Sequence, residues 1–438
     1  MIREFLRASA CIVLFLSPHL ALAENTNFST SHFSGSGNCA MCHDGLTDTS
    51  GENVSIVRDW GTSMMANATK DPFWQAKVAT ELDRTKNLPT DLSAVINDTC
   101  TKCHAPMANY EITQVQGGEL TLFGPDGVLN PNHALHDAAM NGVSCTLCHQ
   151  IDNANLGTAA GFSGEYSIND TKSIYGQFSD IFGQPMVNNT GYTPTYSAHV
   201  SDSALCATCH NVKTPYITAD GDVISEPDSA FPEQMPYTEW QHSIFDDDGS
   251  DPTSCQDCHM PKTTAKVSNR PMWLGTKDGF AKHHLVGANT AMLTLLRDNA
   301  TALGVTSPNL DLGISRARDM LQSAATVDIV SAEIVPDAEG KPLLEARVKV
   351  QNESGHKAPT SYPSRRMWIH FKVTDSDNNV VFESGRMNAD GSIVGADNDA
   401  DQTVFEPHYS EIISEDQVQI YEAIMGDTAD NITYTLLR

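Results

Sequence analysis

Residues 203–210 read Ser203-Ala204-Leu205-Cys206-Ala207-Thr208-Cys209-His210, and they contain the pattern Cys-x-x-Cys-His. The pattern occurs five times in the 438 residues and uses ten of the 11 cysteines. In chain order, motifs 1 to 5 are Cys39/Cys42/His43, Cys100/Cys103/His104, Cys145/Cys148/His149, Cys206/Cys209/His210 and Cys255/Cys258/His259. Because the motifs take almost every cysteine, we expect the fold to be organised around what they bind.

Cys-x-x-Cys-His is the attachment signature of c-type haem. Two thiols add across the two vinyl groups of one porphyrin, and the imidazole that follows becomes the proximal ligand of the iron. A single Cys-x-x-Cys also fits zinc or a redox dithiol, but a zinc site pairs two such motifs and needs no histidine directly after each. The sequence therefore predicts five covalent haem c groups, with His43, His104, His149, His210 and His259 as the proximal iron ligands.

A second imidazole on each iron would give bis-histidine coordination, and ten histidines lie outside the motifs and the first 23 residues. We predict five of them as second ligands: His32, His136, His199, His242 and His283. His356 is a sixth candidate, because it follows Gly355 in a predicted loop and could reach a haem across a domain boundary. His370 and His408 are expected to be structural.

The first 23 residues have the pattern of a secretory signal peptide. Arg3 and Arg7 form a basic start, a short apolar run follows, and residues 21–23 are an A-x-A cleavage site. The run is too short to span a membrane, and no later run reaches the required length. We therefore expect a periplasmic or extracellular protein without a membrane span.

The chain is strongly acidic, with 27 Lys and Arg against 55 Asp and Glu and a formal net charge of −28. This sign excludes nucleic acid as a partner. It is compatible with a cationic partner or surface, although it also serves simply to keep a secreted protein soluble. The expected partners are redox proteins, either other cytochromes or a membrane quinol-oxidising complex, and self-assembly stays open.

The composition predicts two domains after the signal peptide at residues 1–23. Residues 24–325 are expected to form a mostly α and irregular pentahaem domain, with helices at 59–85, 280–300 and 311–325. Residues 326–438 are expected to form an all-β, immunoglobulin-like sandwich, with strands at 327–335, 343–350, 366–374 and 380–384. No cysteine follows Cys258, so this second domain carries no covalent haem. We expect it to be incomplete, since residues 422–438 stop within an element.

Several stretches outside the cysteine pattern carry a family resemblance. They are Asn141-Gly142-Val143-Ser144-Cys145, Glu239-Trp240-Gln241-His242-Ser243, Cys255-Gln256-Asp257-Cys258-His259-Met260-Pro261, Asn352-Glu353-Ser354-Gly355-His356-Lys357-Ala358-Pro359-Thr360 and Arg365-Arg366-Met367-Trp368. With them the chain, over about residues 36 to 438, resembles multihaem c-type cytochromes of the class that includes pentahaem nitrite reductases, octahaem reductases and hydroxylamine oxidoreductases. The last two stretches resemble a β-domain found at the C-terminus of some secreted multihaem cytochromes.

The chain departs from that class in one respect. Nitrite reductases of this kind usually carry Lys in place of His in the catalytic motif, whereas all five motifs here end in His. The sequence therefore favours an electron carrier with closely spaced, low-potential haems in anaerobic-type respiration. The alternative is a multihaem reductase of nitrite, hydroxylamine or a sulfur oxyanion with one open haem. A third possibility is that the β-domain serves adhesion or assembly.

Overall fold

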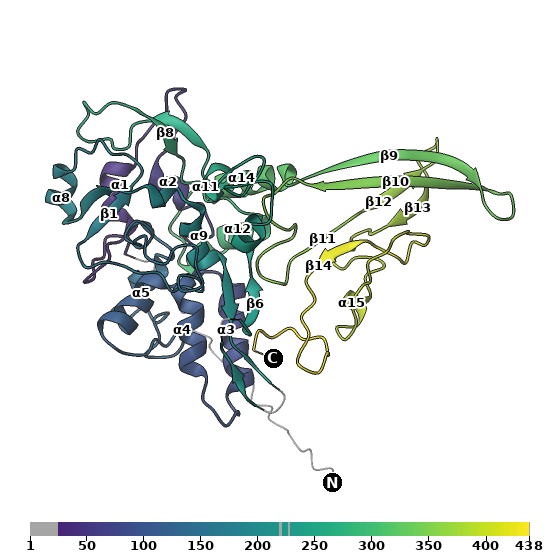
Figure 1. Cartoon of the computed structure of the whole chain (residues 1–438), viewed down its shortest axis with the longest axis horizontal. Helices are drawn as coiled ribbons and strands as arrows, with labels where there is room; N and C mark the ends of the chain where they lie inside the picture. Colours follow the sequence, from purple (N-terminus) through teal and green to yellow (C-terminus); the bar gives the residue numbers. More distant parts are fainter. Residues whose placement is uncertain (1–24, 219–220, 227, 438) are drawn as a thin grey trace, which may run out of the picture.

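The structure is a computed structural model that describes residues 25–218, 221–226 and 228–437. The predicted signal peptide at 1–23, with Cys11, lies outside these residues. A helix-rich part precedes a strand-rich part, from which a long two-stranded ribbon projects (Figure 1). No helix in the described part of the chain is long and apolar enough to cross a membrane.

The helix-rich part combines short helices with two-stranded sheets. Its helices are α1 Ser36–His43, α2 Ile56–Trp60, α3 Pro72–Thr85, α4 Ser93–His104, α5 Pro106–Tyr110, η1 Glu111–Val115, α6 His136–Met140, α7 Cys145–Cys148, α8 Gln184–Thr190, η2 Ala198–Ser201, α9 Ser203–His210, α10 Pro236–Trp240, α11 Cys255–His259, α12 Thr290–Asp298, α13 Ala300–Leu303 and α14 Leu310–Ser323. Its strands are β1 Ser173–Gly176, β2 Thr193–Tyr196, β3 Val212–Thr214, β4 Tyr216–Ile217, β5 Val223–Ile224, β6 Phe231–Gln234, β7 Lys262–Ala265 and β8 Lys277–Ala281, paired as β1–β2, β3–β6, β4–β5 and β7–β8.

Every motif lies on a short helix. In α1, α4, α9 and α11 the motif histidine is the last helical residue, and His149 directly follows α7. Residues three apart on a helix lie on one face, so both thiols of a motif point the same way. The starts of two of these helices are capped. Asp202 accepts a bond of 2.8 Å from the Ala204 amide, and Ser254 and Asp257 form a capping box.

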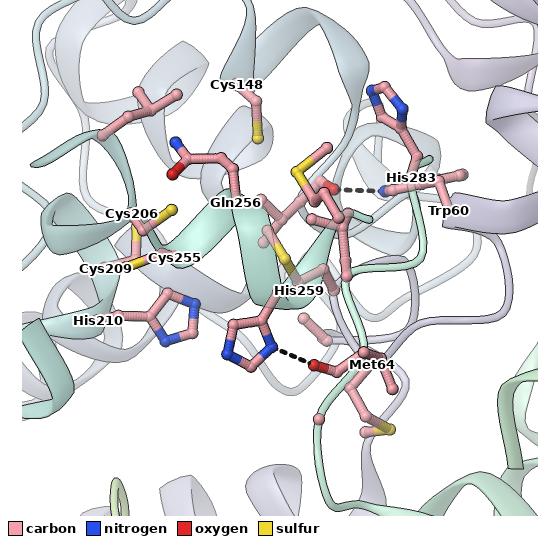
Figure 2. Close-up of a pocket in the computed structure, with 18 of the residues that line it drawn as sticks. Trp60, Met64, Cys148, Cys206, Cys209, His210, Cys255, Gln256, His259 and His283 are labelled. Carbon is pink, nitrogen blue, oxygen red and sulfur yellow. Dashed lines mark hydrogen bonds between the residues drawn. The ribbon is translucent and has the colours of Figure 1, made fainter. Parts of the chain in front are cut away.

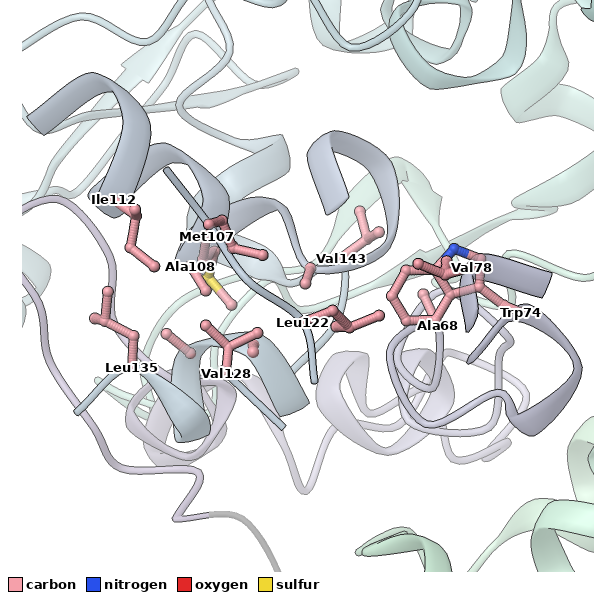
Figure 3. Close-up of a cluster of buried hydrophobic side chains, with 14 of the residues drawn as sticks. Ala68, Trp74, Val78, Met107, Ala108, Ile112, Leu122, Val128, Leu135 and Val143 are labelled. Atoms are coloured by element: carbon pink, nitrogen blue, oxygen red, sulfur yellow. The ribbon is translucent and has the colours of Figure 1, made fainter. Parts of the chain in front are cut away.

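The largest apolar cluster lies among α3, α4, α5 and α6 (Figure 3). Trp74 and Val78 of α3 contribute from one side, and Met107 and Ala108 of α5 from the other. Leu437, near the end of the chain, joins the same cluster. Its carbonyl accepts a bond of 2.7 Å from the Ile217 amide, so the last described residues return to the helix-rich part.

Two predicted helices were wrong in their bounds. Residues 61–70 form turns between α2 and α3, because Asp71 caps a new helix at Pro72 by accepting a bond of 2.8 Å from the Phe73 amide. Residues 277–281 form β8, and α12 begins only at Thr290 after Gly287 and Asn289. The apolar pattern of 280–300 therefore mixes a strand, a loop and a helix. The predicted helix at 311–325 is confirmed as α14.

The strand-rich part contains separate two-stranded sheets. Its elements are β9 Ala325–Pro336, β10 Pro342–Asn352, β11 Arg366–Trp368, β12 Phe371–Thr374, β13 Val380–Ser384, α15 Asp397–Ala400 and β14 Ile420–Glu422, with pairs β9–β10, β11–β14 and β12–β13. The four predicted strands are confirmed, although the third is divided into β11 and β12 by two residues. An immunoglobulin-like sandwich and the boundary at residue 326 stay predictions.

Candidate functional site

One continuous cavity of about 1640 Å³ collects the residues that the sequence singles out. All ten motif cysteines and all five motif histidines line it. Among the described residues, no group of three or more His, Cys, Asp and Glu side chains has the arrangement of a metal-ion site. The volume of the cavity and the five separate motifs that line it suit several large cofactors.

Thiol contacts place neighbouring motifs against each other. The thiol of Cys39 in motif 1 hydrogen-bonds Cys145 of motif 3, which raises the pKa of Cys39. Motif 4 makes two such contacts, one through Cys209 with Cys103 of motif 2 and one through Cys206 with Cys255 of motif 5. Figure 2 shows Cys206, Cys209 and Cys255 together, with the rings of His210 and His259 nearby.

The charge of Cys209 also raises the pKa of Cys148 in motif 3, after the larger effect of burial. Motif 4 is thus adjacent to motifs 2, 3 and 5, while motif 1 adjoins motif 3.

Three of the five motif imidazoles are held in one tautomer by short bonds to backbone carbonyls. The Nδ1 atoms of His43, His149 and His259 donate to the carbonyls of Val267, Tyr175 and Val286 at 2.8, 2.6 and 2.6 Å. A proton held at Nδ1 leaves Nε2 as a free lone pair for a metal.

The motif imidazoles are also neutral at physiological pH. Burial lowers the pKa of His104 and that of His210 to about 4. These histidines are therefore in the form that binds iron.

Two motif imidazoles face a second imidazole across a gap. The ring centroids of His149 and His283 are 6.2 Å apart with an interplanar angle of 25°, and those of His259 and His356 are 6.4 Å apart at 19°. Metal–imidazole bonds of about 2 Å on both sides of one ion put ring centroids roughly 6 Å apart. Both pairs therefore fit bis-histidine coordination of an iron.

Of the five predicted second ligands, His283 lines the cavity. The other four, His32, His136, His199 and His242, do not. His32 places Nε2 3.1 Å from Asp170, and His199 bonds the Ser197 hydroxyl and the Ile151 carbonyl at 2.6 and 2.9 Å. The exposed His242 lies just after α10 and donates 2.7 Å to the Thr238 carbonyl of that helix. Buried His136 bonds the Val128 carbonyl at 2.9 Å. Their assignment as ligands stays a prediction, and the geometry favours His356.

Sequence reasoning missed the residues that surround motif 2. The indole of Trp74 stacks on the His104 ring, with centroids 4.6 Å apart and planes at 5°. Glu233 of β6 and Tyr362, which lies between β10 and β11, line the same cavity. Burial raises the pKa of Glu233 to about 7, opposed by the charge of Lys77. The only sequence signal for Tyr362 was its position between the two family-like stretches 352–360 and 365–368.

Comparisons with known proteins give one structural likeness. No family model matches the chain, and no curated protein matches it. Among solved structures, the chain is similar to a penta-haem cytochrome c552 from Thermochromatium tepidum, with 18% sequence identity and a TM-score of 0.48. The similarity covers 82% of this chain and 75% of that one.

Proposed function

We propose that the chain is an exported pentahaem c-type cytochrome that passes electrons between redox partners. One observation carries the proposal: all fifteen motif residues line a single cavity, so five covalently attached haems would share one interior. The two facing imidazole pairs support it, because their spacing suits iron with two histidine ligands. Such ligation favours the ferric state and hence low potentials, as anaerobic-type respiration requires.

The contacts between motifs suggest how electrons would move. Groups attached at motifs 1, 3 and 4 would follow one another, because motif 1 adjoins motif 3 and motif 3 adjoins motif 4. Motif 4 would then be a branch point, since it also adjoins motifs 2 and 5. A branched arrangement gives more than one place at which a partner protein could deliver or remove an electron.

The remaining parts of the proposal follow from the sequence. We place the mature protein in the periplasm or outside the cell, after removal of residues 1–23, with a haem-bearing domain at 24–325 and a β-domain at 326–438. Its partners would be other cytochromes or a quinol-oxidising complex, and the acidic surface would attract cationic docking sites.

The test is the covalent haem content of protein produced in a host that matures cytochromes c. The intact mass should equal the processed polypeptide plus five haems, and the Soret absorption should persist after denaturation. The double variant Cys206→Ala/Cys209→Ala should lose the mass of one haem. A secreted protein with the mass of the bare polypeptide would refute the proposal.

A second candidate function, a reductase of a small anion, is favoured by the surroundings of motif 2. Among the described residues, a second imidazole faces only the histidines of motifs 3 and 5. Near motif 2, Glu233 would hold a proton near neutral pH, beside Lys77, which forms an ion pair of 2.7 Å with Glu81. Arg365 lines the same cavity near His210 of motif 4, as a positive charge that would attract an anion. A haem iron with a free position supplies electrons directly to a bound substrate.

Titration with nitrite, hydroxylamine, a sulfur oxyanion and carbon monoxide separates the two functions. A visible spectrum that none of the four changes would exclude the reductase. Turnover of any of the first three with a reduced dye would exclude a pure carrier.

A further inference from the structure

We propose that the strand-rich part completes the haem site of motif 5: the loop 353–360 supplies His356 as the second axial ligand, and Glu239 is the positioning residue that holds this loop in place. The inference rests on the proposed function, because it requires a haem at Cys255 and Cys258. It goes further by assigning a ligand and its support to a segment that carries no haem motif of its own.

The two imidazoles of this site are oriented in the same way. His259 donates from Nδ1 to the Val286 carbonyl at 2.6 Å, and His356 donates from Nδ1 to the Lys357 carbonyl at 3.0 Å. Each ring therefore keeps the lone pair of Nε2 for a metal. With centroids 6.4 Å apart and planes at 19°, the rings have the separation that one iron between them requires.

Glu239 of α10 anchors the residues directly after His356. Its Oε2 accepts a bond of 3.0 Å from the Lys357 amide and one of 2.6 Å from the Thr360 hydroxyl. Bonds to a charged carboxylate are stronger than bonds between neutral groups. Because Lys357 is the next residue in the chain, its amide bond fixes the backbone from which the His356 side chain extends.

Trp240, the residue after Glu239, contacts the segment that leads into motif 5. The indole of Trp240 donates to the Thr253 carbonyl at 3.0 Å, two residues before Cys255 of motif 5. The loop packs closely on this indole, since a Cβ atom at Gly355 would lie 3.2 Å from Trp240 Cδ1. Helix α10 thus fixes both the approach to motif 5 and the loop that carries the opposing imidazole.

The loop is continuous with the projecting ribbon. Strand β10 ends at Asn352, whose side-chain amide donates 2.7 Å to the His356 carbonyl. A rotation of the β9–β10 ribbon away from α10 would therefore draw His356 from its position. Binding of His356 to the iron at motif 5 would therefore depend on contact between the strand-rich part and α10.

The experiment counts high-spin and low-spin ferric irons by electron paramagnetic resonance in holoprotein with five haems. His356→Ala should convert one low-spin iron to high spin, and added imidazole should restore it. Glu239→Ala should raise the high-spin fraction at this one site by roughly tenfold or more, because two bonds to a charge are lost. Glu239→Gln, which keeps an acceptor oxygen, should have a smaller effect.

A neighbour of Glu239 serves as the matched control. Gln241→Ala changes an exposed side chain directly after α10 and should keep the wild-type spin count. If His356→Ala lowers the haem content, His356→Met replaces it. That variant should keep a six-coordinate iron with a higher potential at one haem.

Three results would overturn the inference: a wild-type spin count in His356→Ala, a wild-type potential in His356→Met, or equal effects of Glu239→Ala and Gln241→Ala. These outcomes differ from a failure of the proposed function, which would appear as missing haem in the wild-type protein.

Discussion

Glu233 is the residue whose protonation should influence electron transfer near neutral pH. Burial raises the pKa of its carboxyl, Lys77 lowers it and Glu81 raises it, and together they bring the pKa to about 7. The charge of Glu233 in turn raises the pKa values of Cys100 and Tyr362, which places it beside motif 2. Reduction of a haem at motif 2 would therefore be coupled to proton uptake by this carboxyl.

The sign of the pH dependence follows. As the pH rises through about 7, Glu233 loses its proton, and the new negative charge favours the ferric state. We predict that the midpoint potential of one haem falls with pH across this range and that Glu233→Gln removes most of the slope. Spectroelectrochemical titration at several pH values is the measurement. A slope retained in Glu233→Gln would assign the proton to another group.

His283 gives a second prediction for a single residue. It faces His149 and is half-buried, and desolvation lowers its pKa to about 3, so it is neutral at physiological pH. His283→Ala should convert one iron to high spin without loss of haem. His370→Ala is the control, because His370 is expected to be structural and its Nε2 bonds Glu383 at 2.9 Å in the strand-rich part. The prediction fails if the two variants give the same spin count.

Individual residues show which parts of the site could be predicted from sequence and which could not. Cys206, Cys209 and His210 are recognisable because their chemistry depends on local spacing. His283 and His356 lie in loops, and their partners are far away in sequence, so no spacing rule identifies them. For His356 the preceding Gly355 gave a weak signal, whose physical basis is the close approach to Trp240.

Among the elements, α2 and α14 are joined by a buried ion pair. Arg316 of α14 bonds Asp59 of α2 at 3.1 Å, and Asp59 is fully buried. Removing one partner leaves a buried charge without compensation, so Asp59→Ala should lower the free energy of unfolding by about 3–5 kcal/mol. The double variant Asp59→Ala/Arg316→Met should recover part of this loss. Denaturant unfolding monitored by circular dichroism measures both, and additive losses would contradict the pair.

The β9–β10 ribbon illustrates how far periodicity predicts an element. Alternating apolar residues identified both strands, and the register places Ile334 opposite Leu344 and Ile329 opposite Val348 on one face. The side chains of Ile329 and Ile334 are 66% and 70% exposed. Alternation fixes which face is apolar, but what covers that face depends on the tertiary arrangement. The same limit explains why the sequence placed one helix across β8 and α12.

For the whole molecule, the net charge of −28 should control encounters with electron donors. A cationic reductant should react faster at low salt and slow by roughly tenfold or more as salt screens the attraction. An anionic reductant of similar potential should speed up over the same range. Stopped-flow reduction at several ionic strengths tests this. Equal salt dependence for the two reductants would show that local patches outweigh the net charge.

At this scale the sequence predicted the helix-rich and strand-rich parts in the right order, but not that they share one cavity. Helix α14 ends at Ser323 and β9 begins at Ala325, close to residue 326, where the domain boundary stays a prediction. Yet Gly355, His356 and Arg365 line the cavity together with residues of the first part. A change in composition along the chain indicates a change of secondary structure. The residues that line a cavity depend instead on tertiary contacts between loops distant in sequence.

The return of the last residues to the helix-rich part bears on how the protein is made. All five motifs precede residue 260, whereas Leu437 and the loop of His356 are synthesised after them. The attachment machinery would therefore meet each motif on an open chain, before the wall of the cavity exists. The segment that carries Leu437 would then pack over cofactors already in place.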